Sequence, residues 1–198
     1  MAKLYYRYGA MNAGKTTVLL QAAHNYEEMG MHPFLMKPSV DSKGDDLLVS
    51  RLGISRKVDL LCVPSDDLFL RIKSENEKKK IDCVFCDEAQ FLTAEQVDQL
   101  MGVVVELGIP VVCYGLRTDF MRRGFEGSDR LLQTAHTIEE IKTICRCGKK
   151  AIFNGRKVNG KFVFEGSQVA IDGKDSVTYE SLCASCYLRE MRKAGLAR

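Results

Sequence analysis

The sequence predicts an α/β protein, a doubly wound parallel sheet of the phosphate-loop (P-loop) type followed by a small cysteine-bearing β domain. Three observations predict this fold. Residues 9–16 read G-A-M-N-A-G-K-T and match the phosphate-binding loop G-x-x-x-x-G-K-[ST] at every fixed position. Apolar strand-like runs alternate with helical patterns up to Gly115. Two close cysteine pairs stand late in the chain.

The composition bounds the protein's size and class. The 198 residues are 45% hydrophobic and 28% charged, enough for one good core and a small appendage. The net charge of +3 is mild, and no dense Lys/Arg stripe interleaves with aromatics, so a nucleic-acid partner is not indicated. The run of lysines at 78–80 is typical of a solvated helix end. The sequence shows neither a signal peptide nor a long apolar run, so we expect a cytoplasmic protein without a membrane partner.

The first predicted elements surround the phosphate-loop motif. Residues 4–8 are short and aromatic-rich, which favours a strand. Apolar residues recur at helical spacing from Val18 to Met29, and Gly30 provides a stop. Strand, loop and helix are the context that the motif requires. The alternative is a glycine-containing turn that matches by accident.

The loop's chemistry follows from its backbone. Gly9 and Gly14 are expected to permit dihedral angles that turn N–H groups around a phosphate, at the positive end of the new helix. Lys15 would reach the β- and γ-phosphates, and the Thr16 hydroxyl would bind Mg²⁺. The predicted ATP-binding loop comprises Gly9, Ala10, Met11, Asn12, Ala13, Gly14, Lys15 and Thr16.

The next elements alternate as a doubly wound sheet requires. Residues 32–37 favour a second strand, 39–46 a polar loop and 58–63 a third strand. Ser65 is predicted to cap a helix that runs to about Lys79. In the loop, Asp41-Ser42-Lys43-Gly44 fits the D-x-x-G of a GTPase switch, but the chain has no N-K-x-D element, so we reject that interpretation.

Two more strands and a helix complete this part. Residues 81–86 are almost continuously apolar, as expected for a central parallel strand covered on both faces. Thr93 and Gln96 form a capping box for a helix that ends near Gly108. Residues 110–115 predict the next buried strand. In such a sheet the ligand binds at the carboxyl ends of the strands.

An acidic pair follows the strand at 81–86. Behind a phosphate loop, Asp87 would complete the Mg²⁺ coordination sphere with Thr16. Glu88 would lie beside the transferring phosphate and could act as a general base. We therefore add Asp87, Glu88, Ala89 and Gln90 to the ATP-binding residues. The alternative is a pair of solvated loop acids. The string D-E-A-Q resembles a helicase motif, but 198 residues leave no room for a second motor domain.

The loop at 115–125 follows the next strand and would face the same site. Phe120 and Phe125 would supply flat apolar surface, and Arg117, Arg122 and Arg123 would supply anion contacts. The alternative is a solvated basic loop with both phenylalanines turned into the core.

The eight cysteines fall into two groups. Cys62, Cys83, Cys86 and Cys113 lie in apolar strand-like runs, where cysteine commonly serves as a small hydrophobe. Cys83 and Cys86 are three apart on a strand and should point to opposite faces, which makes a poor chelate.

The late cysteines form two close pairs, and they predict a four-thiolate structural zinc site. These are Cys145, Cys147, Cys183 and Cys186. Cys145 and Cys147 would share one face of a strand. Between the pairs, Asn159-Gly160 predicts a hairpin turn. Free or redox-active cysteines are the alternative. We divide the chain into a nucleotide-binding α/β domain, 1–143, and a zinc-binding domain with a short C-terminal helix, 144–198.

Taken together, these motifs resemble the compact, zinc-containing class of thymidine kinases. The resemblance rests on the N-terminal phosphate loop with Met11 inside it, D-E-A-Q-F at 87–91, G-L-R-T-D-F at 115–120 and the late zinc domain, and it covers nearly the whole chain. It implies that Glu88 activates the nucleoside 5′-hydroxyl. It also implies that a lasso-like loop between the cysteine pairs holds thymine. The nucleoside-binding positions that it implies are Met11, Phe91, Leu116, Phe120, Phe125, Val169, Ala170, Ile171, Asp172, Gly173 and Tyr179.

The chain departs from the family pattern at three places. Lys43 stands where the family usually has the arginine of D-x-R, Asp172 replaces a lasso glycine, and residues 174–178 are about two longer. The resemblance implies transfer of the γ-phosphate of ATP to thymidine, and to deoxyuridine as well, in nucleotide salvage. It also implies a homotetramer with thymidine triphosphate as feedback inhibitor. The alternatives are a zinc-ribbon ATPase that binds nucleic acid and a non-catalytic ATP-binding regulator.

Overall fold

The computed structural model describes residues 1–40, 46–168 and 176–196. Its centre is a six-stranded sheet in the order β5-β2-β6-β7-β1-β8, and every neighbouring pair is parallel. This confirms the predicted parallel α/β fold. The strands are β1 (Leu4–Tyr8), β2 (Pro33–Pro38), β5 (Leu60–Cys62), β6 (Cys83–Cys86), β7 (Val111–Gly115) and β8 (Thr137–Glu140).

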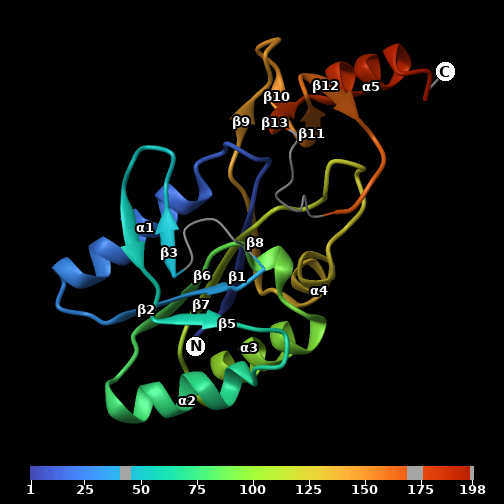
Figure 1. Cartoon of the computed structure of the whole chain (residues 1–198). Coiled ribbons are helices and arrows are strands. Elements are labelled where there is room, and N and C mark those ends of the chain that lie inside the picture. Colours follow the sequence, from blue (N-terminus) through green and yellow to red (C-terminus); the bar gives the residue numbers. More distant parts are fainter. Residues whose placement is uncertain (41–45, 169–175, 197–198) are drawn as a thin grey trace.

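Helices cover both faces of this sheet (Figure 1). One face packs on α1 (Lys15–Glu28), and the other packs on α2 (Leu68–Lys78), α3 (Ala94–Glu106) and α4 (Glu126–Thr134). Neighbouring strand residues alternate between the two cores: Cys83 belongs to the core on the α1 side and Cys86 to the core on the other side. The prediction that these two thiols point to opposite faces is therefore confirmed.

The helix ends follow local capping chemistry. Thr93 and Gln96 make both hydrogen bonds of the predicted capping box at α3. The predicted Ser65 cap of α2 is wrong. Asp67 caps that helix, because its side chain accepts a hydrogen bond from the Leu70 N–H at 2.9 Å, while residues 63–66 form a separate turn.

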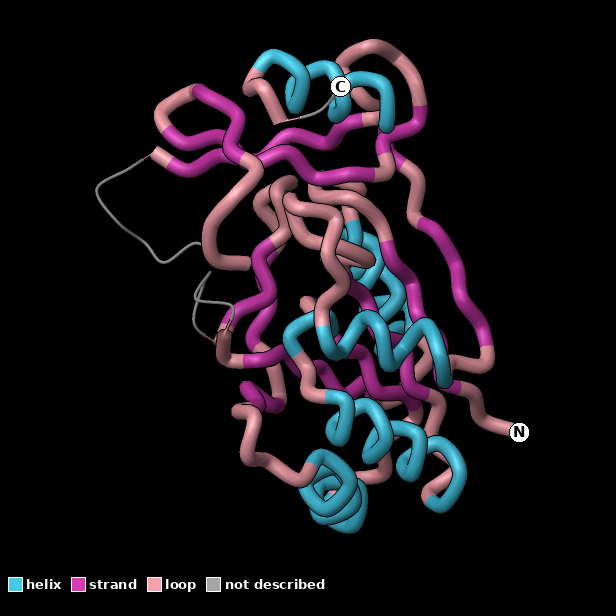
Figure 2. The backbone as a smooth tube through the Cα atoms, turned by 90° about the vertical axis from the view of Figure 1, so that its right-hand side faces the viewer, coloured by secondary structure: helices cyan, strands magenta, loops and turns pink. Residues whose placement is uncertain are grey.

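A smaller set of elements, which includes α5 and the β9–β10 hairpin, lies beyond one end of the central sheet (Figures 1 and 2). It contains the hairpin β9 (Thr143–Ile144) and β10 (Lys150–Ala151), the antiparallel sheet β12-β11-β13, and α5 (Ala184–Lys193). The three sheet strands are β11 (Phe153–Val158), β12 (Lys161–Val163) and β13 (Val177–Leu182). Asn159 and Gly160 join β11 to β12 with φ angles of 49° and 80°, which confirms the predicted hairpin.

The remaining elements had no sequence-based prediction. They are α4, β8, the short hairpin β3 (Leu47–Val49) and β4 (Ser55–Lys57), and the 3₁₀ turn η1 (Ala89–Phe91). Within the described ranges, no helix combines the length and apolar character that a membrane crossing needs.

The parallel arrangement decides where the functional loops meet. The phosphate loop follows β1, the acidic pair follows β6 and the 116–125 loop follows β7. Because β6, β7 and β1 are adjacent and parallel, these three loops emerge side by side at one edge of the sheet. The small sheet lies at that same edge, since β11 and β13 hydrogen-bond to the phosphate loop and to the 116–125 loop.

Candidate active site

The phosphate loop takes its shape from two residues with positive φ. Gly14 has φ of 81°, as predicted, and the second is Asn12 with φ of 65°. Gly9, which was expected to contribute a permissive dihedral angle as well, is not among the residues with positive φ. Gly9 is needed for space instead: a Cβ there would lie 2.5 Å from the Ile141 carbonyl oxygen and 3.0 Å from the Ala13 Cβ. The loop is therefore pressed against the chain that leaves β8.

Lys15 lies inside the loop. Its Nζ donates to the carbonyl oxygens of Gly9 at 3.1 Å and Ala10 at 3.0 Å, and only 8% of the residue is exposed. Burial lowers the pKa of its ammonium group, while the nearby charges of Glu88 and Asp87 act in the opposite direction. The cation is thus held where a phosphate entering the loop would meet it.

Thr16 and Asp87 meet directly. The Thr16 hydroxyl donates to Oδ2 of Asp87 at 2.7 Å, while the buried Oδ1 of Asp87 has no hydrogen-bond partner. Burial raises the pKa of Asp87 to about 7, the Glu88 charge adds to the rise and the Thr16 hydrogen bond opposes it. Mg²⁺ prefers oxygen ligands such as a hydroxyl and a carboxylate, and one oxygen of this carboxylate has no other partner. The residues present therefore fit the predicted ion.

Glu88 has an unusual backbone conformation at the start of η1. Its φ of 48° places it in the left-handed region, which is rare for a residue with a side chain. The Gln90 side chain holds it there: Nε2 donates to Oε2 of Glu88, and Oε1 accepts from the Leu116 N–H at 3.0 Å. Gln90, which is 2% exposed, therefore connects the carboxylate to the loop after β7.

Two glycines allow this close packing. A Cβ at Gly115 would lie 2.9 Å from Oε1 of Gln90, and a Cβ at Gly127 would lie 2.5 Å from the Ala89 carbonyl oxygen. The first turn of α4 thus sits directly against the backbone of η1. Neither contact was foreseen from the sequence.

The predicted nucleoside-binding side chains gather beside this site only in part. Phe91 and Phe125 meet edge to face, with ring centroids 5.6 Å apart. Leu116 and Phe120 are buried, and Met11 is half-buried on the phosphate loop. Arg117 and Arg122, expected to contact anions, stack on the rings of Tyr8 and Tyr187. The predicted lasso residues 169–173, like the departure at Lys43, lie outside the described residues.

Arg156 is a buried charge that sequence reasoning missed. Its guanidinium lies 3.7 Å from the centroid of the Phe120 ring and donates to the Tyr179 hydroxyl at 2.9 Å. It also donates to the backbone carbonyls of Ser167 and Gln168 at 2.6 and 2.7 Å. The side chain thereby ties β11 to the 116–125 loop and to the chain after β12. One arginine in a basic hairpin carries no sequence signal for this role.

The predicted zinc cysteines come together. The sulfur atoms of Cys145, Cys147, Cys183 and Cys186 all lie within 4.8 Å of one another. Tetrahedral zinc with Zn–S bonds of about 2.3 Å needs sulfurs roughly 3.8 Å apart, so the donor set and its spacing fit zinc.

Each cysteine pair has its own local geometry. Cys183 caps α5, and the Cys186 N–H donates to its Sγ at 3.4 Å, which lowers the pKa of Cys183 to about 7. The expectation that Cys145 and Cys147 share a strand face is wrong. They lie on the turn between β9 and β10, which Gly148 closes with φ of 82°.

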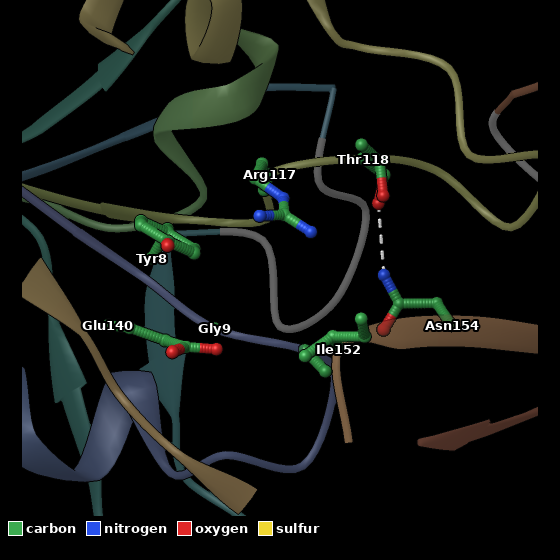
Figure 3. A pocket seen from close by; sticks show the side chains of 8 residues that line it. Tyr8, Gly9, Arg117, Thr118, Glu140, Ile152 and Asn154 are labelled. Atoms are coloured by element: carbon green, nitrogen blue, oxygen red, sulfur yellow. Dashed lines mark hydrogen bonds between the residues drawn. The ribbon is translucent and has the colours of Figure 1, made fainter. Parts of the chain in front are cut away.

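A small pocket lies between the phosphate loop and strand β11 of the small sheet (Figure 3). Tyr8 and Gly9 line it from β1 and the loop, Arg117 and Thr118 from the loop after β7, and Asn154 from β11. Asn154 Nδ2 donates to the Thr118 carbonyl at 2.9 Å across the pocket (Figure 3). Elements that are distant in sequence are therefore joined at this point.

A phosphate loop, its lysine and a threonine–aspartate pair at one edge of a parallel sheet define a P-loop nucleotide-binding protein. The comparisons with known proteins narrow this class. The family model described as thymidine kinase matches residues 2–187, and the chain belongs to the thymidine kinase family. Relatives named thymidine kinase include one from Ruegeria pomeroyi, 48% identical over 92% of both chains. Another, from Mesorhizobium japonicum, is 48% identical over 98% of this chain and 95% of its own.

Proposed function

We propose that this protein transfers the γ-phosphate of ATP to the 5′-hydroxyl of thymidine, and also of deoxyuridine, to give the monophosphate for nucleotide salvage. The observation that carries the proposal is the family match over residues 2–187. The local geometry supports it, because the Thr16–Asp87 pair and Glu88 stand beside Lys15 at the mouth of one phosphate loop. Phosphoryl transfer needs positioning and charge stabilisation more than covalent chemistry.

The donor side is proposed to use residues 9–16 and 87–90. Backbone N–H groups of the loop and the N-terminus of α1 hold the donor phosphates, and Lys15 exchanges its two carbonyl partners for phosphate oxygens. Thr16 and Asp87 hold Mg²⁺, which neutralises phosphate charge when it is bound. The buried Oδ1 of Asp87, which has no hydrogen-bond partner, supports this assignment, because a bound cation would compensate it.

The acceptor side is proposed to use Glu88 as the general base. Gln90 orients the carboxylate by binding one oxygen, which leaves the other free to take the proton from the 5′-hydroxyl. Met11, Phe91, Leu116, Phe120, Phe125 and Tyr179, together with lasso residues 169–173, are proposed to surround the nucleoside. Mixed apolar and polar surroundings of this kind are typical of small-molecule sites.

The cysteine cluster is proposed to bind a structural zinc ion. Four thiolates close together repel one another, so a divalent cation is needed to keep them charged in one place. We keep the proposed division into 1–143 and 144–198, a boundary that falls between the two residues of β9. In this arrangement the metal-stabilised domain is the base from which the lasso projects.

Three further properties complete the proposal. We propose a homotetramer, inhibition by thymidine triphosphate, and action in the cytoplasm without a nucleic-acid or membrane partner. None of the eight cysteines, which all lie in the described part of the chain, forms a disulfide, as is usual in a reducing compartment. Size measurement at working concentration and inhibition by thymidine triphosphate at fixed ATP would test the first two.

One incubation tests the reaction. The protein is given Mg-ATP with equal amounts of thymidine, deoxyuridine, deoxycytidine, deoxyadenosine and deoxyguanosine, and the products are identified by mass spectrometry. We expect thymidine monophosphate, with deoxyuridine monophosphate second. ADP with every nucleoside unchanged would overturn the kinase proposal and favour an ATPase that binds nucleic acid, which a salt-dependent gel shift would then reveal.

A further inference from the structure

Both polar groups of one phosphate-loop residue are bound by the small sheet. The Met11 N–H donates to Oδ1 of Asn154 at 2.7 Å, and the Met11 carbonyl accepts a hydrogen bond from the Ser181 hydroxyl. Asn154 and Ser181 are 3% and 6% exposed, so these bonds are shielded from water. A backbone N–H bonded in this way is not available to a phosphate.

The two side chains stand opposite each other on neighbouring strands. In the antiparallel register of β11 and β13, Asn154 pairs with Ser181. Asn154 is held at its other end, because Nδ2 donates to the Thr118 carbonyl (Figure 3). The two side chains that bind Met11 are therefore held in place themselves. The pairing of β11 with β13 sets their positions, and the hydrogen bond to Thr118 fixes the amide of Asn154.

The next cross-strand pair on the same face anchors the ladder itself. Arg156 pairs with Tyr179 in the register, two residues along from Asn154 and Ser181. Arg156 binds the carbonyls of Ser167 and Gln168, and Gln168 in turn donates to the Gly124 carbonyl at 2.9 Å. The sheet face that binds Met11 is thus connected by side-chain hydrogen bonds to the chain after β12 and to the 116–125 loop.

We propose that Asn154 and Ser181 are positioning residues for the phosphate donor: they clamp the Met11 peptide and so fix the conformation of the phosphate loop. The clamp acts one residue before Asn12, whose positive φ is unfavourable for a residue with a side chain. The hydrogen bonds to the Met11 N–H and to the Met11 carbonyl keep this turn formed before ATP binds. The remaining loop N–H groups are then already oriented towards phosphate. This inference rests on the proposed role of the loop in binding ATP.

The test measures the binding of Mg-ADP by calorimetry in the absence of a nucleoside. We expect Ser181→Ala and Asn154→Ala each to raise the Kd of Mg-ADP by roughly 3- to 10-fold, the effect of one lost net hydrogen bond. Ser181→Thr keeps the hydroxyl and should restore the wild-type Kd. Thr178→Ala changes an exposed residue of the same strand and is the matched control. Because both variants act on the backbone of one residue, the double variant should lose less than the product of the two effects.

Amide hydrogen exchange of the 9–16 peptide in the free protein gives a second readout. We expect faster exchange there in Ser181→Ala than in wild type, with unchanged exchange in α3 and β7. Wild-type Kd and wild-type exchange in both alanine variants would overturn the clamp. Failure of the wild-type protein to bind Mg-ADP would instead overturn the proposed function, so the two failures are distinguishable.

Discussion

Glu88, the proposed general base, adopts a backbone conformation that residues with a side chain rarely take. A left-handed conformation costs a residue with a Cβ about 1–2 kcal/mol, and the Gln90 hydrogen bonds and the packing of α4 on η1 offset this cost. The conformation turns the chain sharply after β6, so that Asp87 faces Thr16 while Glu88 remains half-buried at the edge of the site. Strain that the surroundings maintain is common at functional positions.

Replacing Glu88 by Gln tests its proposed role. The amide keeps the shape and can still accept from Gln90, so we expect the fold and the Kd of Mg-ADP to be retained. The kcat for thymidine phosphorylation should fall by about 10²–10⁴-fold, as for loss of a general base. Steady-state kinetics measures this, and Glu77→Gln at an exposed position of α2 is the control. Turnover close to wild type would remove Glu88 from the mechanism.

Gly9→Ala tests whether space or dihedral freedom is needed at the first loop glycine. An added Cβ would be 2.5 Å from the Ile141 carbonyl, so the loop or the chain after β8 must shift. We expect a loss of about 1–3 kcal/mol in the free energy of unfolding, as for overpacking, with weaker Mg-ADP binding. Denaturant titration measures the first effect. Unchanged stability would show that the contact can relax without cost.

At the scale of elements, helix ends position the loops that carry the site. The α3 capping box fixes the helix start shortly after η1, and α4 begins where Gly127 meets the Ala89 carbonyl. The N-terminus of α2 is defined differently: the side chain of Asp66 accepts from the Val63 N–H and closes a turn, and Asp67 then caps the helix. Ser65, an equally good cap residue by type, stands two residues too early in the chain.

The two cap positions of α2 make a matched pair. We expect Asp67→Ala to lower the free energy of unfolding by about 1 kcal/mol, because a helix N–H loses its partner. Ser65→Ala should change it by less than about 0.5 kcal/mol, as for an ordinary surface position. Thermal or denaturant unfolding measures both, and thymidine turnover should not change in either. A larger loss in the serine variant would contradict the assignment.

At the scale of the whole molecule, a large unit built on the central sheet contacts a small unit built on the sheet β12-β11-β13. The central sheet has two apolar cores of its own, whereas the small unit has one core of six buried residues, three of which are cysteines. Such a unit needs a further source of stability, which the proposed zinc ion would supply. Its contacts through Asn154, Ser181 and Tyr187 then reach the phosphate loop and the 116–125 loop.

Removal of the metal should therefore destabilise the small unit more than the central sheet. We expect a strong chelator, or Cys186→Ser, to abolish zinc binding and to expose residues 144–196 to limited proteolysis, while the central sheet stays resistant. Elemental analysis and mass spectrometry of the fragments measure the two effects. Cys83→Ala, a buried thiol outside the cluster, should keep its zinc. Proteolysis of both units at equal rates would show that the central sheet also depends on the metal.

Sequence by itself determined the features that are local in the chain. The phosphate loop between a strand and a helix, the Thr93–Gln96 capping box and the Asn159-Gly160 turn are each fixed by residues within one turn of one another. Hydrophobic periodicity was enough for five of the six strands of the parallel sheet, and the cysteine spacing was enough for a four-sulfur cluster. Such signals survive in sequence because backbone propensity and side-chain chemistry act over a few residues.

Tertiary structure alone decided the features that need partners far apart in the chain. The edge strand β8 reads Thr-Ile-Glu-Glu and pairs with β1 mainly through its backbone, so it has no apolar signature. Gly9 needs space because Ile141 passes it, and Arg156 is buried because two loops close over it. The clamp on Met11 joins residues more than 140 positions apart. Only the folded chain brings these groups together. Their positions are set by the free energy of packing and not by local backbone preference.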